Sequence, residues 1–309
     1  MLLARFQPVT VVDPLEPFRP TDVNGFVHDA TLETQSAPGS WSLVDPHPQL
    51  ATLPTRDSAS CQSQGLAMCY RLNQQPCSPT AGPIGDLACY EAGWLTGDRR
   101  STVYGRVAYR PRKIVLQYWY FYYDDVYSYD YPPDDVFWQA HEGDWEAVTI
   151  VLRRSTQRPL YAAYSQHCTG IRRPWAGVER RGTHPVDHIA IGSHANLFAA
   201  GTQPIATQCV PPQALMILNQ LGLPAPVDRS AAGGAQLGPP LPGVMQTAIR
   251  RVDRWHTPWI AFDGTWGEDQ IFHAPPPVGT VVSGTSPVSP ALTDLWQHPL
   301  NITRSWPAG

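Results

Sequence analysis

An imidazole and two carboxylates lie close together in the sequence HEGDWEAVTIVL, residues 141–152. Side chains alternate along a strand, so a strand beginning at Asp144 places Asp144 and Glu146 on one face, about 6.5 Å apart at Cα. Two ionised acids that are partly desolvated at this separation destabilise each other. A protonated acid, an intervening arginine or a divalent cation would each relieve the repulsion, and the nearby His141 favours the cation.

The donor types restrict which cation would bind. Carboxylate oxygens with one imidazole suit Mg²⁺, Ca²⁺ or Mn²⁺, and also Zn²⁺ where water fills the remaining position. A solvated strand start with an arginine partner is the structural alternative. Both interpretations remain open from the spacing of His141, Asp144 and Glu146 alone.

Two neighbouring segments could supply groups that contact a ligand. In QYWYFYYDD, residues 117–125, three tyrosines share one face of a predicted strand: Tyr118, Tyr120 and Tyr122. This face either packs in a core or lines a groove for a sugar or headgroup. The turn GSHAN, residues 192–196, follows an apolar strand and could bring His194 to the same end of the sheet. Ser193 and His194 are adjacent in the chain and face apart, which argues against a serine triad.

These residues must be positioned by short elements, because 33 prolines and 24 glycines interrupt the chain. Alternating or β-branched patterns predict strands at 101–111, 113–125, 145–152, 160–167 and 187–195. Helical periodicity is confined to 213–223 and, more weakly, 243–256. Without a helix after each strand, the pattern predicts a mainly β fold, an antiparallel two-sheet β-sandwich with one or two peripheral helices.

Length and composition are consistent with one globular unit. The 309 residues are 42% hydrophobic and 16% charged, with a net charge of −4, so a basic nucleic-acid-binding face is not expected. We expect a single domain over 1–309, with a Cys-containing excursion at 55–100 and a Pro/Gly-rich loop at 224–243. The sequence contains no run of about 18 apolar residues, so it predicts no membrane-spanning helix.

The six cysteines bear on the compartment. Four of them lie within the excursion at 55–100, without the tight pairs that zinc sites use, so disulfides are the favoured interpretation over a zinc cluster. Disulfides indicate secretion or another oxidising compartment. If the first residue is the native start, the alternative is the cytoplasm.

Four motifs in order resemble the vacuolar protein sorting-associated protein 62 family. They are LQYWYFYYDD, HEGDWEAVTIVL, IAIGSHAN and WIAFDGTWGE, the last at residues 259–268. The resemblance runs from about residue 6 to residue 300. The family's name reflects a trafficking phenotype, so this resemblance implies a fold more than a reaction.

A more distant resemblance implies chemistry. The necrosis- and ethylene-inducing-peptide-like toxins carry the heptapeptide G-H-R-H-D-W-E at the start of a strand in a β-sandwich. There an Asp, a His, an Asp and a Glu hold a divalent cation that helps to engage sphingolipid sugar headgroups. The heptapeptide aligns with residues 140–146, where Glu142 and Gly143 replace the Arg and the second His.

The resemblance also implies a fourth ligand upstream of the heptapeptide. Its candidates are Asp124, Asp125, Asp134 and Asp135. The metal ligands predicted in this way are His141, Asp144, Glu146 and Asp124.

Three functions follow as expectations. The first is binding of a glycan, a lipid headgroup or another oxygen-rich small molecule at the metal end of the sheets, with Tyr118, Tyr120, Tyr122 and His194 in contact. The second is a metal-assisted hydrolase or lyase acting on a carbohydrate or phosphoester, with His194 or Glu142 as the acid–base group. The third is a scaffold with a structural cation. The oligomeric state is left open.

Overall fold

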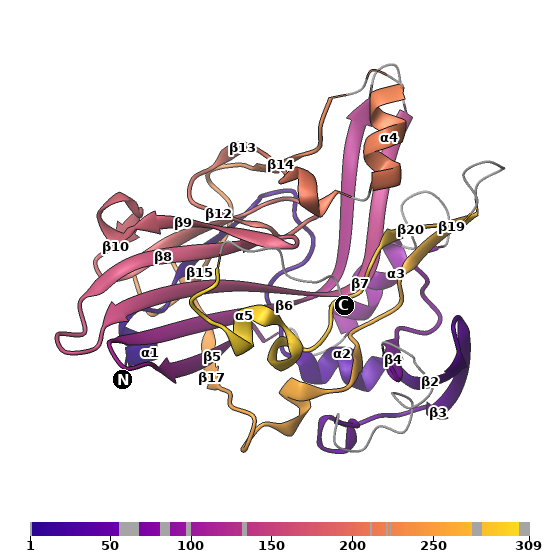
Figure 1. Cartoon of the computed structure of the whole chain (residues 1–309), viewed down its shortest axis with the longest axis horizontal. Coiled ribbons are helices and arrows are strands. Elements are labelled where there is room, and N and C mark those ends of the chain that lie inside the picture. Colours follow the sequence, from indigo (N-terminus) through magenta and orange to yellow (C-terminus); the bar gives the residue numbers. More distant parts are fainter. Residues whose placement is uncertain are drawn as a thin grey trace.

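The computed structural model describes most of the chain, namely residues 2–55, 68–80, 87–96, 100–131, 135–210, 212–220, 222, 224–273 and 280–302. Figure 1 shows long strands crossing the molecule, with short helices around them. The helices are α1 (Leu2–Arg5), α2 (Val23–Asp29), α3 (Leu87–Thr96), α4 (Pro212–Gln220) and α5 (Asp294–Gln297). The mainly β prediction is confirmed.

The central sheet contains the two longest strands. Its order is β17 (Ala248–Arg251), β5 (Thr102–Tyr109), β6 (Lys113–Tyr131), β7 (Asp135–Arg153), β8 (Pro159–Gln166) and β9 (Thr169–Pro174). The β-branched and aromatic residues predicted as a strand at 113–125 form most of β6. Neighbouring strands are antiparallel except β17, which runs parallel to β5.

The second sheet is shorter and mixed. Its order is β10 (Arg180–Arg181), β11 (His184–Ile189), β1 (Val9–Val12), β15 (Gln236–Gly238) and β16 (Met245–Gln246), with β12 (Asn196–Leu197) also paired to β11. The pairs β1–β11 and β15–β16 are parallel. The prediction of purely antiparallel sheets was therefore wrong, because strands distant in sequence pair side by side in the same direction.

Smaller sheets complete the fold. They are β13 (Gly201–Pro204) with β14 (Val227–Ser230), β19 (Gln270–His273) with β20 (Thr280–Gly284), and the series β18 (Gly264–Thr265), β4 (Tyr70–Asn73), β2 (Thr31–Ala37) and β3 (Ser40–Asp45). Within the expected excursion at 55–100 lie β4 and α3, and within the expected loop at 224–243 lie β14 and β15.

One predicted helix formed and the other did not. Helix α4 matches the periodic segment at 213–223. The segment at 243–256 was predicted as a helix, but it contains β16 and β17. Because β17 pairs with the edge of β5, its backbone groups are satisfied by the sheet, and this pairing outweighs a weak helical periodicity.

The two faces of β6 pack against different partners. On one face, the Tyr118 hydroxyl donates to the Leu3 carbonyl at 2.9 Å, and the Tyr120 hydroxyl accepts from Thr10 of β1 at 3.3 Å. On the other face, the Phe121 ring lies 5.0 Å from the Phe26 ring of α2. The aromatic run therefore packs into core on both sides, which favours the packing alternative for these tyrosines.

Strands β6 and β7 turn sharply together. In Figure 1 they cross the molecule from the left and then rise beside α4. Gly143 of β7 has φ +58°, and a Cβ at this position would overlap the backbone of Trp266. A side chain is therefore excluded where the acidic residues of the motif lie.

Two disulfides join described cysteines, Cys77 with Cys89 and Cys168 with Cys209. This bears out the preference for disulfides over a zinc cluster and fits an oxidising compartment. None of the described helices has the length and apolar character needed to cross a membrane.

Candidate metal centre

Three side chains converge beside the sharp turn of β6 and β7. Asp125, Asp144 and His194 each offer one ligand atom, and these atoms all lie within 4.8 Å of one another. His194 Nδ1 is 3.1 Å from Asp144 Oδ2. The side chains of Asp125 and Asp144 are 10% and 11% exposed, whereas His194 is fully buried. All three residues are therefore buried, and within the group only the two carboxylates keep a small exposed fraction.

The strand register explains how Asp125 joins Asp144. Asp144 lies opposite Tyr122, three residues before Asp125, so strict alternation would place Asp125 on the other face. The pairing ladder skips the Tyr123–Gly143 position, where Gly143 adopts a left-handed backbone. The faces switch at this point, so Asp125 lies on the same side as Asp144.

His194 is fixed between two carboxylates and an aromatic ring. Its ring stacks on Tyr122, with centroids 3.9 Å apart and planes 4° apart. Its Nε2 lies 3.3 Å from Glu16 Oε1 on the side away from Asp144. Burial lowers the pKa of His194, but Glu16 and Asp144 outweigh burial and raise this pKa well above its usual range. A charged imidazole thus stabilises the two carboxylates, and a cation would compete with its proton.

His141 borders the group in an orientation that suits a metal ligand. Its Nδ1 lies 2.8 Å from the Gly143 carbonyl, which accepts a hydrogen bond from the Nδ1–H tautomer. Its Nε2 then faces Asp125 Oδ2 at 3.8 Å. A backbone carbonyl that fixes the tautomer in this way is typical of metal-binding histidines. Burial raises the pKa of Asp125 to about 6, His141 opposes this shift and Asp144 adds to it.

Glu146 lies two residues after Asp144, at the next position on the same face of β7. It accepts hydrogen bonds from the Ser165 hydroxyl and from Asn196 Nδ2, the latter at 3.1 Å. Burial and then the Asp144 charge raise the pKa of Glu146 well above its usual range. Glu146 is therefore tied to β8 and β12, beside the group of three that the geometry brings together.

A third imidazole, which was not among the residues predicted from the sequence, lies near enough to interact electrostatically with Asp125 and Asp144. His167 Nε2 lies 3.0 Å from Asp228 Oδ1, and the Ser193 hydroxyl donates to the same oxygen at 2.6 Å. Burial lowers the pKa of His167, but Asp228 outweighs it and, together with Asp125 and Asp144, raises the pKa. Ser193 therefore contacts Asp228 and not its neighbour His194, which agrees with the argument against a serine triad.

Asp124 lies on the opposite side of the two strands. The group of three contains Asp125 in place of the predicted Asp124, because of the switch at Gly143. Asp124 is fully buried, and neither of its oxygens has a hydrogen-bond partner among the described residues. Of the other upstream candidates, Asp134 and the side chain of Asp135 lie outside the described part of the chain.

Glu142, the second acid–base candidate, is enclosed beside Asp124. It accepts hydrogen bonds from the Tyr90 hydroxyl at 2.9 Å, from the Gln74 amide at 3.1 Å and from the Glu268 amide at 2.9 Å. Burial raises its pKa to about 8, against the opposing effect of the Gln74 hydrogen bond. These partners hold Glu142 in the core and away from the carboxylates at the open side of the group.

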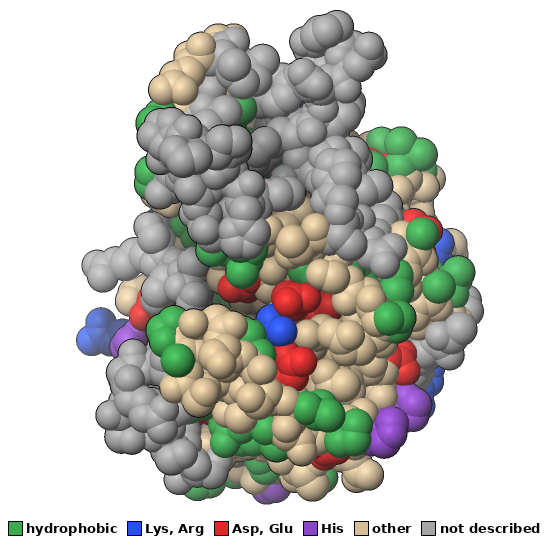
Figure 2. Space-filling view, turned by 90° about the vertical axis from the view of Figure 1, so that its right-hand side faces the viewer, with side chains coloured by type: hydrophobic (Ala, Val, Ile, Leu, Met, Phe, Trp, Pro, Cys, Tyr) green, Lys and Arg blue, Asp and Glu red, His purple; other side chains and the backbone are tan. Residues whose placement is uncertain are grey.

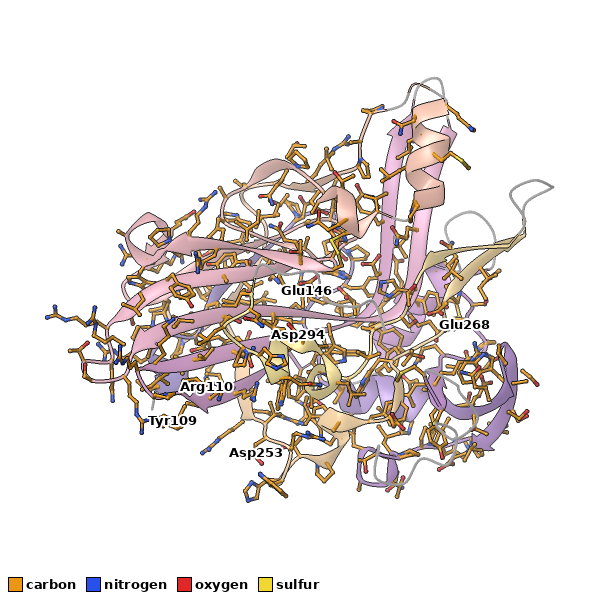
Figure 3. All side chains as sticks on the ribbon, viewed as in Figure 1. Tyr109, Arg110, Glu146, Asp253, Glu268 and Asp294 are labelled. Atoms are coloured by element: carbon orange, nitrogen blue, oxygen red, sulfur yellow. A yellow bond between two sulfur atoms is a disulfide. The ribbon has the colours of Figure 1, made fainter. Side chains whose placement is uncertain are left out.

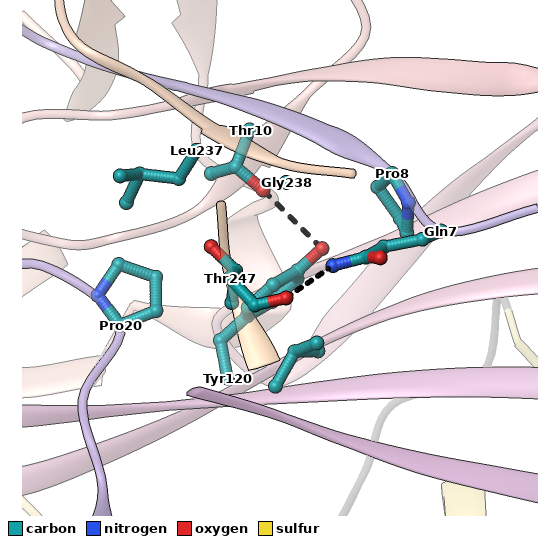
Figure 4. A pocket seen from close by; sticks show the side chains of 9 residues that line it. Gln7, Pro8, Thr10, Pro20, Tyr120, Leu237, Gly238 and Thr247 are labelled. Carbon is teal, nitrogen blue, oxygen red and sulfur yellow. Dashed lines mark hydrogen bonds between the residues drawn. The ribbon is translucent and has the colours of Figure 1, made fainter. Parts of the chain in front are cut away.

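The three predicted ligand-contacting tyrosines are all buried. Tyr118, Tyr120 and Tyr122 are 0%, 3% and 0% exposed. Tyr120 lines a small pocket together with Thr10, Gln7 and Thr247. Figure 4 shows that hydrogen bonds join Thr10 to Tyr120 and Gln7 to Thr247 in the lining of this pocket. Of the three, Tyr122 alone touches the group, through its stack on His194.

Solved structures similar to this chain include necrosis- and ethylene-inducing proteins. Necrosis and Ethylene inducing Protein 2 from the causal agent of cocoa's Witches Broom disease is 15% identical, with a TM-score of 0.30 over 79% of this chain and 72% of that one. The non-toxic HaNLP3 protein is 12% identical, with a TM-score of 0.33 over 83% and 74%. NLPPya, solved in complex with mannosamine, is 12% identical, with a TM-score of 0.34 over 83% and 72%.

The sequence comparisons add no family. No protein-family model matches the sequence, and no curated protein matches it. The resemblance to the vacuolar protein sorting-associated protein 62 family therefore rests on the four motifs alone. Because the TM-scores are below 0.5, we draw no conclusion about the ligand of this chain from the similar structures.

Proposed function

We propose that Asp125, Asp144 and His194 hold a divalent cation, and that this cation binds a glycan or lipid headgroup at its open side. The observation that carries the proposal is the convergence of two carboxylates and one imidazole within 4.8 Å, where the carboxylates keep a small exposed fraction and the imidazole keeps none. Ligand oxygens can complete a coordination shell that protein closes on one side only.

The surrounding residues fit a cation of the hard, oxygen-preferring class. Two carboxylates with one imidazole suit Mg²⁺, Mn²⁺ or Ca²⁺, and Zn²⁺ with water in a further position. His141 Nε2 and the Glu146 carboxylate lie next to the group, so either can complete the shell or orient the ligands. The three predicted metal ligands other than Asp124, namely His141, Asp144 and Glu146, are then all used.

The same geometry favours binding over catalysis. A hydrolase or lyase acting on a carbohydrate or phosphoester needs an acid–base group that faces the substrate. His194 is fully buried between Glu16 and Asp144, and Glu142 is enclosed by three donors on the other side. A purely structural cation would not need carboxylates that reach solvent. The two disulfides fit a secreted protein that meets glycans and headgroups outside the cell.

Calorimetric titration with Mg²⁺, Mn²⁺, Ca²⁺ and Zn²⁺ tests the proposal. We expect one cation per chain, and we expect Asp144→Asn to weaken binding at least about 100-fold, the upper range for losing a ligand or its support. Asp294→Asn is the matched control, because Asp294 begins α5 and pairs with His298 at the surface. Equal affinity in the two variants, or no binding to the wild type, would refute the cation site.

Binding of the glycan or headgroup is tested on the protein loaded with the cation. Binding of a glycan panel and of lipid headgroups is compared with and without EDTA. We expect binding that EDTA abolishes and that Asp144→Asn lacks. Binding that survives both treatments would place the ligand elsewhere.

A further inference from the structure

The end of the central sheet farthest from the cation group is lined with basic side chains. It is formed by the β5–β6 turn, the β7–β8 turn and the last residues of β9. We call it the basic end, and its exposed or half-exposed cations are Arg110, Arg112, Lys113, Arg153, Arg154, Arg158, Arg172 and Arg173. The segments that form it, 109–113, 153–158 and 169–174, contain no Asp or Glu.

Backbone and ring contacts gather these charges into one surface. The Arg154 amide donates to the Arg112 carbonyl at 3.0 Å, and Arg154 Nη1 donates to the Arg110 carbonyl at 3.2 Å. Lys113 Nζ and the Arg172 guanidinium both lie over the Tyr161 ring, 5.7 Å and 5.1 Å from its centroid. Cations from three segments are thus held side by side.

These charges lack acidic partners. Among the residues that the structure describes, no ion pair includes any of the eight cations of the basic end. By contrast, on the side that faces the viewer in Figure 2, acidic side chains gather around a basic one. Elsewhere in the molecule, Arg71 bridges Glu33 and Glu268 at 2.5 Å and 2.9 Å. Repulsion among unpaired cations is relieved when an anionic surface covers them.

Large aromatic side chains project beside the same charges. Tyr109, next to Arg110, is 59% exposed, and Trp255 is 89% exposed. Asp253 Oδ1 accepts from the Trp255 amide at 2.9 Å and thereby closes the turn that presents this ring. The turn follows β17 along the edge of β5, the strand that ends at Tyr109, because the Val252 amide donates to the Gly105 carbonyl at 3.0 Å. In Figure 3, Tyr109 and Arg110 lie together at the left, and Asp253 lies below them.

We propose that the basic end binds a membrane surface that contains anionic lipids, with Tyr109 and Trp255 at the level of the headgroups. Basic residues near such a surface are attracted to it, and Trp and Tyr prefer the interface between water and lipid. Nucleic acid, the other large polyanion, is the alternative that the test excludes, since charge alone would suffice for it.

This surface is independent of the cation site. Strand β6 runs from Lys113 at the basic end to Asp125 at the cation group, roughly 40 Å of extended chain. A protein docked by its basic end would therefore present the cation group away from that membrane. The experiments on the cation site and on the basic end therefore test the two proposals independently.

Vesicle co-sedimentation tests the proposal on the full chain. We expect binding to phosphatidylcholine vesicles that contain phosphatidylserine, none to phosphatidylcholine alone, and loss of binding at high salt. Arg112→Gln/Arg158→Gln should lower the partition coefficient about 25-fold, about fivefold for each cation. Arg19→Gln is the control, because Arg19 is equally exposed and lies outside the segments of the basic end.

A second variant separates lipid from nucleic acid. Trp255→Ala should weaken vesicle binding roughly fivefold, because part of the ring leaves water at the interface. It should leave any binding to short duplex DNA unchanged. Absence of vesicle binding would overturn the proposal. An effect of the arginine pair no greater than that of Arg19→Gln, or tighter binding to DNA than to vesicles, would do the same.

Discussion

The two sides of β6 and β7 at their sharp turn stabilise acidic residues in different ways. On one side, Asp125 and Asp144 face the imidazole of His194 and reach solvent. On the other side, Asp124 and Glu142 lie opposite each other in the strand register and are fully buried. The two pairs come from adjacent positions of the same strands, and Gly143 separates them.

The difference shows that the repulsion between neighbouring carboxylates can be relieved in more than one way. Burial, and then Glu142, raise the pKa of Asp124 well above its usual range, and burial raises the pKa of Glu142 to about 8. This enclosed pair therefore holds a proton, and its Glu142 accepts hydrogen bonds from fixed donors. The other pair, Asp125 and Asp144, keeps a small exposed fraction and has a histidine whose proton a cation can replace. Only a pair of carboxylates that keeps some access to water can become a binding site.

Truncating one acid on each side should give the largest contrast. Glu142→Ala should lower the free energy of unfolding by about 4 kcal/mol, because Tyr90, Gln74 and Glu268 would each keep a buried donor without an acceptor. Asp144→Ala should cost about 1 kcal/mol or less, since His194 retains Glu16. Urea denaturation at constant m-value measures both, and equal losses would contradict the comparison.

Cation-dependent stabilisation should distinguish the adjacent residues Asp124 and Asp125. A cation at 100 times its Kd should raise the free energy of unfolding of the wild type by about 2.7 kcal/mol. Asp125→Asn should lose this increase, whereas Asp124→Asn, one position away, should keep it. Thermal denaturation with and without the cation is the measurement. If Asp124→Asn alone removed the increase, the ligand assignment would revert to the one predicted from sequence.

The sequence was sufficient for the long strands β5 to β8 of the central sheet, but not for the short strands or for how the strands pair. The aromatic and β-branched run at 113–125 predicts β6 because both of its faces suit a packed sheet. Periodicity carries no information about distant neighbours, so the parallel pairing of β1 with β11 could not be predicted. The segment at 243–256 failed for the same reason, since only the edge of β5 makes β17 a strand.

For the site, the sequence identified Asp144 and His194 from their places at strand ends, and the structure brings them together. It could not choose Asp125 over Asp124, because that choice depends on the backbone of Gly143 and not on alternation. A glycine among charged strand residues is the signal that could have warned of a switch of face. No feature of the sequence identified His167, because its partner Asp228 comes from a strand that is distant in the chain.

The pH dependence of stability should separate the two sides with a smaller effect. An acid whose pKa is raised on folding keeps a proton that the unfolded chain has released, so stability falls as pH rises between the two pKa values. For Glu142 this interval runs from 4.5 to about 8, at about 1.4 kcal/mol for each pH unit. For Asp125 it runs only from 3.8 to about 6.

Between pH 6 and 8, therefore, Glu142→Gln should flatten the decline in stability, because the neutral amide has no proton to lose. Asp125→Asn should flatten the decline mainly below pH 6, with a smaller effect above it, because the Asp125 charge also raises the pKa of His167. Denaturation midpoints measured across the pH range give the slopes. Flattening above pH 6 by Asp125→Asn, and not by Glu142→Gln, would reverse the assignment of the buried proton.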